Sequence, residues 1–158
     1  PRGWLMASDL SGIMSAMVTA IAAANGAGSY TYNLSGVGQV VWGNVENPPM
    51  NPFVCMWLEG VDAEHGPDLS SFRRTIGITG IGWVGATADT AIAREQAAAD
   101  LLDDILTAFE VDVSLGGRLW SAKISGQSFD GSGTAWADRG LVIFRLEAWY
   151  VKAIGTGV

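Results

Sequence analysis

Cysteine is almost absent from this chain of 158 residues. The one cysteine, Cys55, lies inside the apolar run FVCMWL, so an intramolecular disulfide is excluded. Apolar neighbours raise the pKa of a thiol, which is the opposite of what a reactive cysteine needs. We therefore expect Cys55 to be a small core hydrophobe in a protein suited to a reducing compartment.

Basic residues are also scarce. The sequence has 9 lysines and arginines against 16 aspartates and glutamates, which gives a formal net charge of −7. Tight binding to nucleic-acid phosphates needs clustered lysines and arginines, and this composition argues against it. Acidity is still compatible with a protein past which DNA slides without adhering, because like charges repel.

Long apolar runs are missing as well. The longest candidate, IMSAMVTAIAAA, is interrupted by Ser15 and Thr19 and is shorter than the roughly 18–20 residues that span a bilayer. We expect no membrane segment and a soluble protein. Residues 1–5, PRGWL, do not have the pattern of a signal peptide, and we expect them to be disordered, an expression scar or an upstream start.

Hydrophobic spacing predicts two helices. The first begins at a Ser8 cap and stops at Asn25-Gly26, with an apolar face made of Leu10, Ile13, Met14, Met17, Val18 and Ile21. The second is capped by Thr87 or Asp89, and its apolar stripe comprises Ala98, Leu102, Ile105, Leu106 and Phe109. Acidic residues occupy the predicted solvent face of the second helix: Glu95, Asp100, Asp103 and Asp104.

Four β-prone segments are predicted as strands: FVCMWLEG, SFRRTIGITGIGWV, RLWSAKISG and GLVIFRLEAWYV. The segment 59–68, EGVDAEHGPD, is predicted as an exposed loop, and 26–43 and 126–138 as extended loops or hairpins, with SYTYNL and QVVWG as weak strands that could pair. Strands in adjacent pairs predict a single α+β domain over residues 1–158. We expect a mixed, mostly antiparallel sheet with two helices packed on it.

The stretch GIGWVG, residues 80–85, matches the glycine fingerprint of dinucleotide-binding proteins, G-x-G-x-x-G. A true site also needs a carboxylate about 20 residues further on, at the end of a second strand. Counting on from Gly85 reaches Asp103 and Asp104, which fall inside the second helix. We expect no nucleotide cofactor, and interpret the glycines as thinning one face of a strand that lies against another chain or twists sharply.

Catalytic signals are weak. His65 is the only histidine and lies among Asp62, Glu64 and Asp68, where a solvated acidic loop is the simplest interpretation. A catalytic triad would require the fold to bring this histidine next to a serine and an aspartate. The acidic residues could hold a hard cation weakly, but they lack the D-x-D-x-D-G spacing of a calcium-binding loop. We expect no catalytic or metal-binding residues, and hence no enzyme. The alternative from the enzyme class is a small dinucleotide-binding oxidoreductase.

Tryptophan is plentiful, with 7 residues. Several fall in turn-rich or glycine-rich places where a monomer would struggle to bury them: Trp42, Trp83, Trp120 and Trp136. Exposed aromatic side chains favour protein–protein surfaces. The alternative is that Trp57 and Trp149 belong to the core and the others are half-buried.

Taken in order, the segments from Met6 to about Val151 resemble the tail terminator, or tail completion, proteins of long-tailed bacteriophages. The resemblance rests on the amphipathic helix SDLSGIMSAMVTAIAAA, the proline-led strand NPPMNPFVCMWLEG, the acidic loop and the arginine-bearing strand SFRRTIGITGIGWV. It continues through AIAREQAAADLLDDILTAFEVDVSLGG, RLWSAKISG and GLVIFRLEAWYV. The glycine-rich segment 26–43 and the segment GQSFDGSGTAWAD depart from the compact family pattern.

The resemblance implies a subunit that forms a hexameric ring on the end of the tail tube. Such a ring stops tube polymerisation, offers a surface to head-completion or connector proteins, and surrounds the channel through which DNA passes without specific binding. The implied location is the head-proximal end of the virion tail, assembled in the host cytoplasm. A tail-tube subunit or a head–tail adaptor is the alternative within the viral class.

A cyclic ring needs heterologous interfaces, in which two different patches meet. We therefore predict that the strand with Arg73 and Arg74 faces acids of the adjacent subunit. The candidate partners lie in the 59–68 loop or on the second helix: Asp62, Glu64, Asp68, Asp100, Asp103 and Asp104. Three tryptophans are candidate contacts to the tube or connector: Trp42, Trp83 and Trp136.

Overall fold

The computed structural model describes residues 9–65, 71–131 and 138–153. Two helices and five strands follow one another along the chain. Their bounds are α1 Asp9–Ala22, β1 Val40–Trp42, β2 Phe53–His65, β3 Ser71–Gly85, α2 Ala91–Glu110, β4 Ser121–Asp130 and β5 Arg139–Ala153. This order of helices and strands is the one predicted from the sequence.

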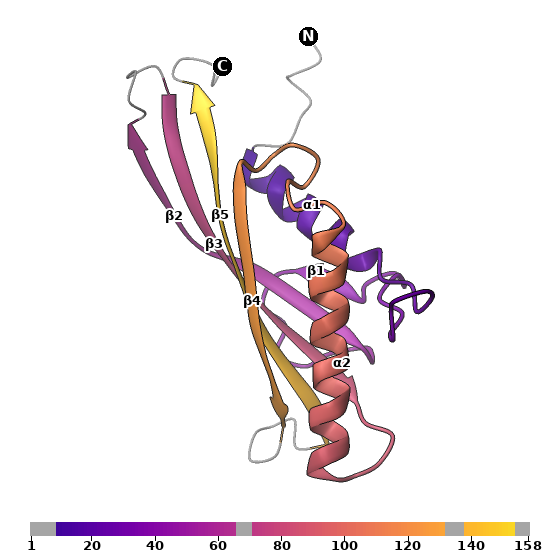
Figure 1. The fold of residues 1–158 in the computed structure, drawn as a ribbon. Helices are drawn as coiled ribbons and strands as arrows, with labels where there is room; N and C mark the ends of the chain where they lie inside the picture. Colours follow the sequence, from indigo (N-terminus) through magenta and orange to yellow (C-terminus); the bar gives the residue numbers. More distant parts are fainter. Residues whose placement is uncertain (1–8, 66–70, 132–137, 154–158) are drawn as a thin grey trace.

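The five strands form one open sheet in the order β1-β2-β3-β5-β4. The β2–β3, β3–β5 and β5–β4 pairs are antiparallel, and only the three-residue β1 runs parallel to β2. Both helices pack on the same face of this sheet (Figure 1). The predicted fold class, α+β with a mixed and mostly antiparallel sheet, is confirmed.

The apolar face of α1 packs into the core as predicted. Ile13, Met14, Met17 and Ile21 are buried, and Leu10 and Val18 lie partly buried at the margin. The predicted cap residue, Ser8, lies outside the described residues. For α2 the predicted cap is wrong by one residue or more, because Thr90 holds the extended cap conformation and its Oγ1 accepts a hydrogen bond from the Ala93 N–H (3.1 Å).

The predicted loop at 59–68 is wrong over its first seven residues. Strand β2 continues through them to His65, and they pair in register with β3, as Asp62 with Thr75 and Glu64 with Arg73. The register shifts between Leu58 and Gly60, so the glycine marks an irregularity within the strand rather than its end. Acidic and small residues suggest a loop locally, but pairing with the long β3 decides their conformation.

The predictions for the two excursions are partly wrong. SYTYNL forms no strand, and the two weak segments do not pair with each other, because Val40–Trp42 pairs with β2 instead. Residues 126–130, expected in an extended loop or hairpin, form the end of β4 and pair antiparallel with β5, as the arm of a hairpin does. Residues 132–137 lie outside the described residues.

The centre of the sheet is thinned by glycines on the face that the helices cover. A Cβ on Gly80 would overlap the ring of Phe144, a buried side chain of β5. A Cβ on Gly82 would approach Leu101 of α2 to 3.0 Å. The predicted thinning of this strand is therefore confirmed, but its own neighbours, and not another chain, occupy the space.

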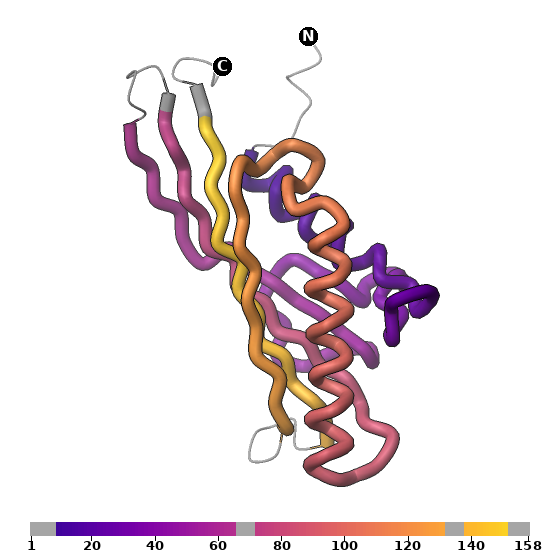
Figure 2. The backbone as a smooth tube through the Cα atoms, in the orientation of Figure 1, coloured from indigo at the N-terminus to yellow at the C-terminus, as the bar shows by residue number. Residues whose placement is uncertain are grey.

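The ends of β2, β3 and β5 splay away from the two helices (Figure 2). Toward the opposite end of the sheet, a second small core lies on the other face, with Phe53, Cys55, Trp83 and Leu141 buried in it. Val45, from the segment between β1 and β2, packs against this cluster. The prediction that Cys55 is a buried hydrophobe is confirmed, and burial raises the pKa of its thiol.

The Gly80 contact gives a stability prediction. We expect Gly80→Ala to destabilise the protein by about 1–3 kcal/mol, because the added methyl overpacks the site that Phe144 fills. Urea unfolding measures the difference. Gly60→Ala is the matched control, since its Cβ would meet nothing within 4 Å and its effect should stay below about 1 kcal/mol. Pairing Gly80→Ala with Phe144→Leu should cost less than the two single changes together, and simple additivity would contradict the overlap.

Candidate assembly surface

One face of the sheet carries no helix in the part of the chain that the structure describes. We call it the open face. It is formed by the odd-numbered side chains of β3, β4 and β5, which the register places on the same side as Asp62 and Glu64 of β2. The even-numbered side chains of β5 pack on the helices, which explains why Ile143, Arg145 and Glu147 are exposed while their neighbours are buried.

An ionic cluster occupies the middle of the open face. Arg145 of β5 pairs with Glu59 of β2 across the intervening strand, and also contacts Glu147 at 3.2 Å. The Thr79 hydroxyl donates a hydrogen bond to the same Glu59 carboxylate (2.7 Å). All three charged side chains are about half exposed, so the cluster is worth little stability but keeps this surface polar and ordered.

Aromatic and basic side chains meet toward the splayed end. The Arg73 guanidinium lies 4.6 Å from the ring centre of Trp149, whose ring packs beside Trp120 with centroids 5.6 Å apart. Trp120 is 71% exposed. A large exposed aromatic beside a stacked arginine is typical of surfaces that bind another protein.

The predicted contact between the strand with Arg73 and Arg74 and the acids of an adjacent subunit stays a prediction. Consecutive strand residues point to opposite faces, so Arg73 lies on the open face and Arg74 on the other, where it donates a hydrogen bond to Tyr150 (3.3 Å). Arg73 already lies 3.8 Å from Glu64 of its own chain. A partner that covers only the open face therefore meets Arg73 and not Arg74.

The acidic loop imagined around His65 is not a cluster either. Asp62 and Glu64 project to the open face, whereas His65 packs against Phe72 on the other side, with ring centroids 4.4 Å apart. Asp68 lies outside the described residues. Within residues 9–65, 71–131 and 138–153, no three histidine, cysteine or acidic side chains gather as a metal site would require.

Asp104 overturns the expectation of a solvated helix face. It is 1% exposed, and its carboxylate accepts hydrogen bonds from the backbone N–H groups of Thr31 (2.9 Å) and Tyr32 (2.7 Å). The excursion after α1 thus docks on α2 through this side chain. Burial of Tyr32, and then the nearby charges of Asp100 and Asp104, raise the pKa of its phenol. Helical spacing gives the clue that the sequence interpretation missed, because Asp104 lies three residues after the buried Leu101.

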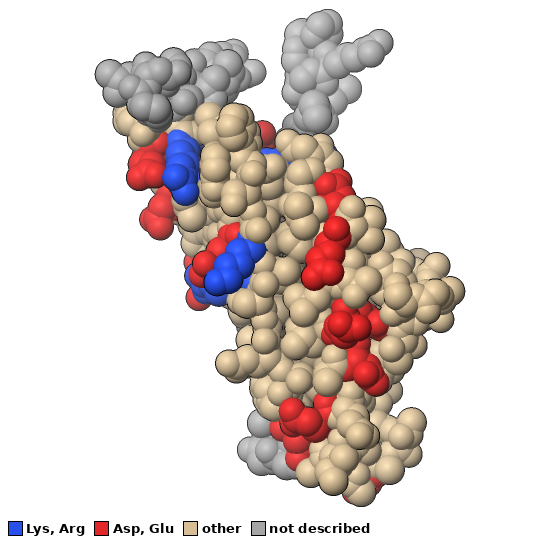
Figure 3. All heavy atoms as spheres, in the orientation of Figure 1, with Lys and Arg blue, Asp and Glu red and all other residues tan. Residues whose placement is uncertain are grey.

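The other acids of α2 remain on the surface. Asp100 and Asp103 are exposed, and acidic side chains run down the side of the molecule where α2 lies (Figure 3). Between Asp89 and Asp112 the chain has seven of its 16 acidic residues and a single basic one, Arg94. Most of the net charge of the protein therefore lies in α2 and the residues that flank it.

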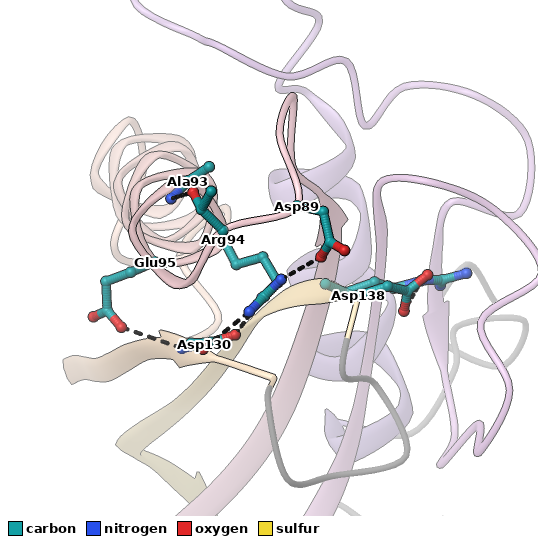
Figure 4. A network of polar contacts seen from close by, with 8 residues as sticks. Asp89, Ala93, Arg94, Glu95, Asp130 and Asp138 are labelled. Carbon is teal, nitrogen blue, oxygen red and sulfur yellow. Dashed lines mark hydrogen bonds and ion pairs between the residues drawn. The ribbon is translucent and has the colours of Figure 1, made fainter.

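Arg94 anchors the start of α2. Its side chain is 11% exposed and pairs with Asp130 at the end of β4 (2.5 Å) and with Asp89 before the helix (2.6 Å), as Figure 4 shows. Glu95 accepts a hydrogen bond from the Asp130 backbone N–H (3.1 Å). The hydrogen bond to Asp130 is the main reason that the pKa of Arg94 is raised. Arg94 is therefore not part of a solvated helix face, and it fixes the first turn of α2 to the sheet.

One of the three predicted tryptophan contacts is overturned. Trp83 is 2% exposed and stacks on Phe53, with centroids 5.7 Å apart, so it is a core residue and not a surface contact. Trp42 is 50% exposed and stays a candidate. Trp136 lies outside the described residues.

The glycine fingerprint has no phosphate-binding geometry. Residues 80–85 all lie within β3, so there is no turn between strand and helix at this point. The space beside Gly80 is filled by Phe144, and that beside Gly82 by the side chains of α2. These positions leave no room for a pyrophosphate group.

A groove between α1 and the end of α2 was not predicted from the sequence. It has a volume of about 650 Å³, and small apolar side chains form much of its lining, among them Ala16, Ala20, Ala23, Val111 and Leu115. Asp112 and Arg118 add polar groups to it. Ser114 and Gly116 donate hydrogen bonds to the Asp112 carboxylate, and these bonds order the turn beside the groove. The same hydrogen bonds lower the pKa of Asp112.

No protein-family model and no curated protein sequence matches the chain. Neither described helix is long and apolar enough to cross a membrane.

The buried Asp104 gives a testable prediction. We expect Asp104→Asn to destabilise the protein by about 1.5–3 kcal/mol, because an amide replaces a carboxylate that accepts two backbone hydrogen bonds. Chemical denaturation measures it. The neighbouring exposed Asp103→Asn makes the same chemical change and should stay within about 0.5 kcal/mol of the parent protein. Equal effects of the two substitutions would show that Asp104 does not hold the excursion.

Proposed function

We propose that this chain is a structural subunit of a bacteriophage virion, a tail terminator that forms a ring on the end of the tail tube. In this role it ends tube polymerisation and joins the tail to head-completion or connector proteins. The observation that carries the proposal is that the sheet has an uncovered face and unpaired strand edges. Outside the small core around Trp83, one face of it lacks a covering layer in the described residues, and β4 and most of β2 lack a neighbouring strand on their outer side.

A sheet with unpaired edges and an uncovered face fits a subunit whose sheet is extended or covered by neighbouring subunits in an assembly. Exposed strand edges present unpaired N–H and C=O groups that another chain can pair with. The ionic cluster around Arg145 and Glu59 keeps the open face polar before assembly. Trp120 and Ile143, 71% and 43% exposed, give the same face apolar contact points.

The order of segments adds support. The resemblance to tail terminators runs through the N-terminal helix, the proline-led strand, the arginine-bearing strand, the second helix and the two last strands, and these correspond to α1, β2, β3, α2, β4 and β5. The resemblance implies an α+β subunit, and this chain has that fold class. Partners under the proposal are other copies of this chain, the tube protein and a connector protein.

The charge also suits this role. The subunit has a net charge of −7, and a ring of such subunits presents like charge to a DNA duplex in its channel. DNA then passes without specific binding. A nucleotide-dependent oxidoreductase is disfavoured by the packing at Gly80 and Gly82, where a cofactor phosphate would overlap Phe144 and Leu101. A tail-tube or adaptor subunit differs from a terminator in how its assembly ends.

The test is the form of the assembly. We expect the purified protein to give closed rings of one size, six-fold by the resemblance, in negative-stain images and in mass measurements by light scattering. Open-ended filaments would assign the chain to tube subunits, and particles that stay monomeric at high concentration would contradict the proposal. Calorimetric titration with NAD and FAD should give no heat of binding, and micromolar binding of either would favour the oxidoreductase.

A further inference from the structure

The two edges of the sheet are unequal and both are partly unpaired. β1 pairs only with Val54–Met56 of β2, so β2 from Trp57 to His65 has no strand on its outer side among the described residues. On the other edge, β4 borders only β5. The Asp130 N–H, at the end of β4, already donates a hydrogen bond to the Glu95 carboxylate. The part of β4 whose outer backbone groups have no strand partner in the part of the chain that the structure describes is therefore residues 121–129.

The strand directions favour joining these two edges. Each of the three pairs from β2 through β3 and β5 to β4 is antiparallel, so β2 and β4 run in opposite directions. A rotation about an axis roughly along the strands places β4 of one copy beside β2 of the next. The new pair is then antiparallel, which is the more stable arrangement.

The charges on the two edges are complementary. Between Trp57 and His65 there are three acids and no lysine or arginine, whereas residues 121–129 have a single charged residue, Lys123. Asp62 and Lys123 project from the open face, both are exposed, and neither makes an ion pair with another described residue. Pairing two β2 edges would oppose acid to acid, and pairing two β4 edges would bring two lysines together.

We propose that copies of this chain join head to tail, with residues 121–125 of β4 pairing antiparallel to residues 60–64 of β2 in the next copy and Lys123 opposite Asp62. This register sets Ser121 opposite Glu64 and Ser125 opposite Gly60, and it keeps the open-face side chains of both copies on one side. The contact is heterologous, so repeating it either closes a ring or continues as a filament. Ring closure rests on the proposed function, whereas the edge pairing itself does not.

A charge-swap experiment tests the register. Lys123→Glu and Asp62→Lys should each raise the concentration at which the assembly dissociates by about tenfold, because each sets like charges opposite one another. Combining both changes in one chain should restore assembly to near the parent value. Sedimentation velocity over a concentration series measures this, and Glu110→Lys on α2 is the control for net charge, with no expected effect. A combined variant no better than the single ones would overturn the register.

Cross-linking tests the pairing without requiring closed rings. Asp62→Cys protein mixed with Lys123→Cys protein should form a disulfide-linked dimer on mild oxidation, since facing residues of antiparallel strands lie within disulfide range. Each variant alone should not, and the native Cys55 is fully buried. A mixture with Glu110→Cys is the matched control. No dimer above this control would overturn the edge pairing, even if rings form. Dimers from a protein that forms no ring would instead contradict the proposed function alone.

Discussion

The close approach of α2 to the sheet is the constraint on which the rest of the structure depends. Gly82, Gly126 and Gly140, on three different strands, lie where a Cβ would meet Leu101, Leu102 and Ala98 of the helix. Bare backbone beneath α2 lets its side chains reach the sheet, and the Arg94 pairs with Asp89 and Asp130 hold its first turn in place. With α2 fixed on one face, the strands leave the opposite face uncovered in the described residues, apart from the small core around Trp83.

This one-sided packing separates the charges of the molecule. The solvent-exposed side of α2 has acidic side chains, while the open face of the sheet has both acidic and basic side chains, in ion pairs such as Arg145 with Glu59. Like charge repels along α2, whereas the open face and the strand edges combine polar pairs with exposed apolar and aromatic groups. Under the proposed function, the mixed surface is the one that contacts other chains and the acidic surface is the one that repels DNA.

Much of the fold followed from sequence patterns. The β-prone run that forms β5, and the apolar spacing in α1, reflect rules that act within one element, so both elements were predicted correctly. Errors arose where contacts between distant segments decide the outcome. Residues 59–65 look like a loop but pair with β3, and Asp104 looks solvated but binds the backbone of Thr31 and Tyr32, more than 70 residues away. Of the predicted surface residues, Trp83 proved to be core for the same reason.

The sequence by itself determined the fold class, the order of the elements, the strong acidity and the thinning of β3, because composition and periodicity are local properties. Only the tertiary structure decided what the glycines are for. GIGWVG is compatible with either a phosphate turn or a thinned strand, and the distinction depends on Phe144 and Leu101, which enter from other elements. Likewise, the two unpaired edges and the meeting of Arg145 with Glu59 across β3 follow from the order and register of the strands, since pairing between strands fixes which side chains share a face.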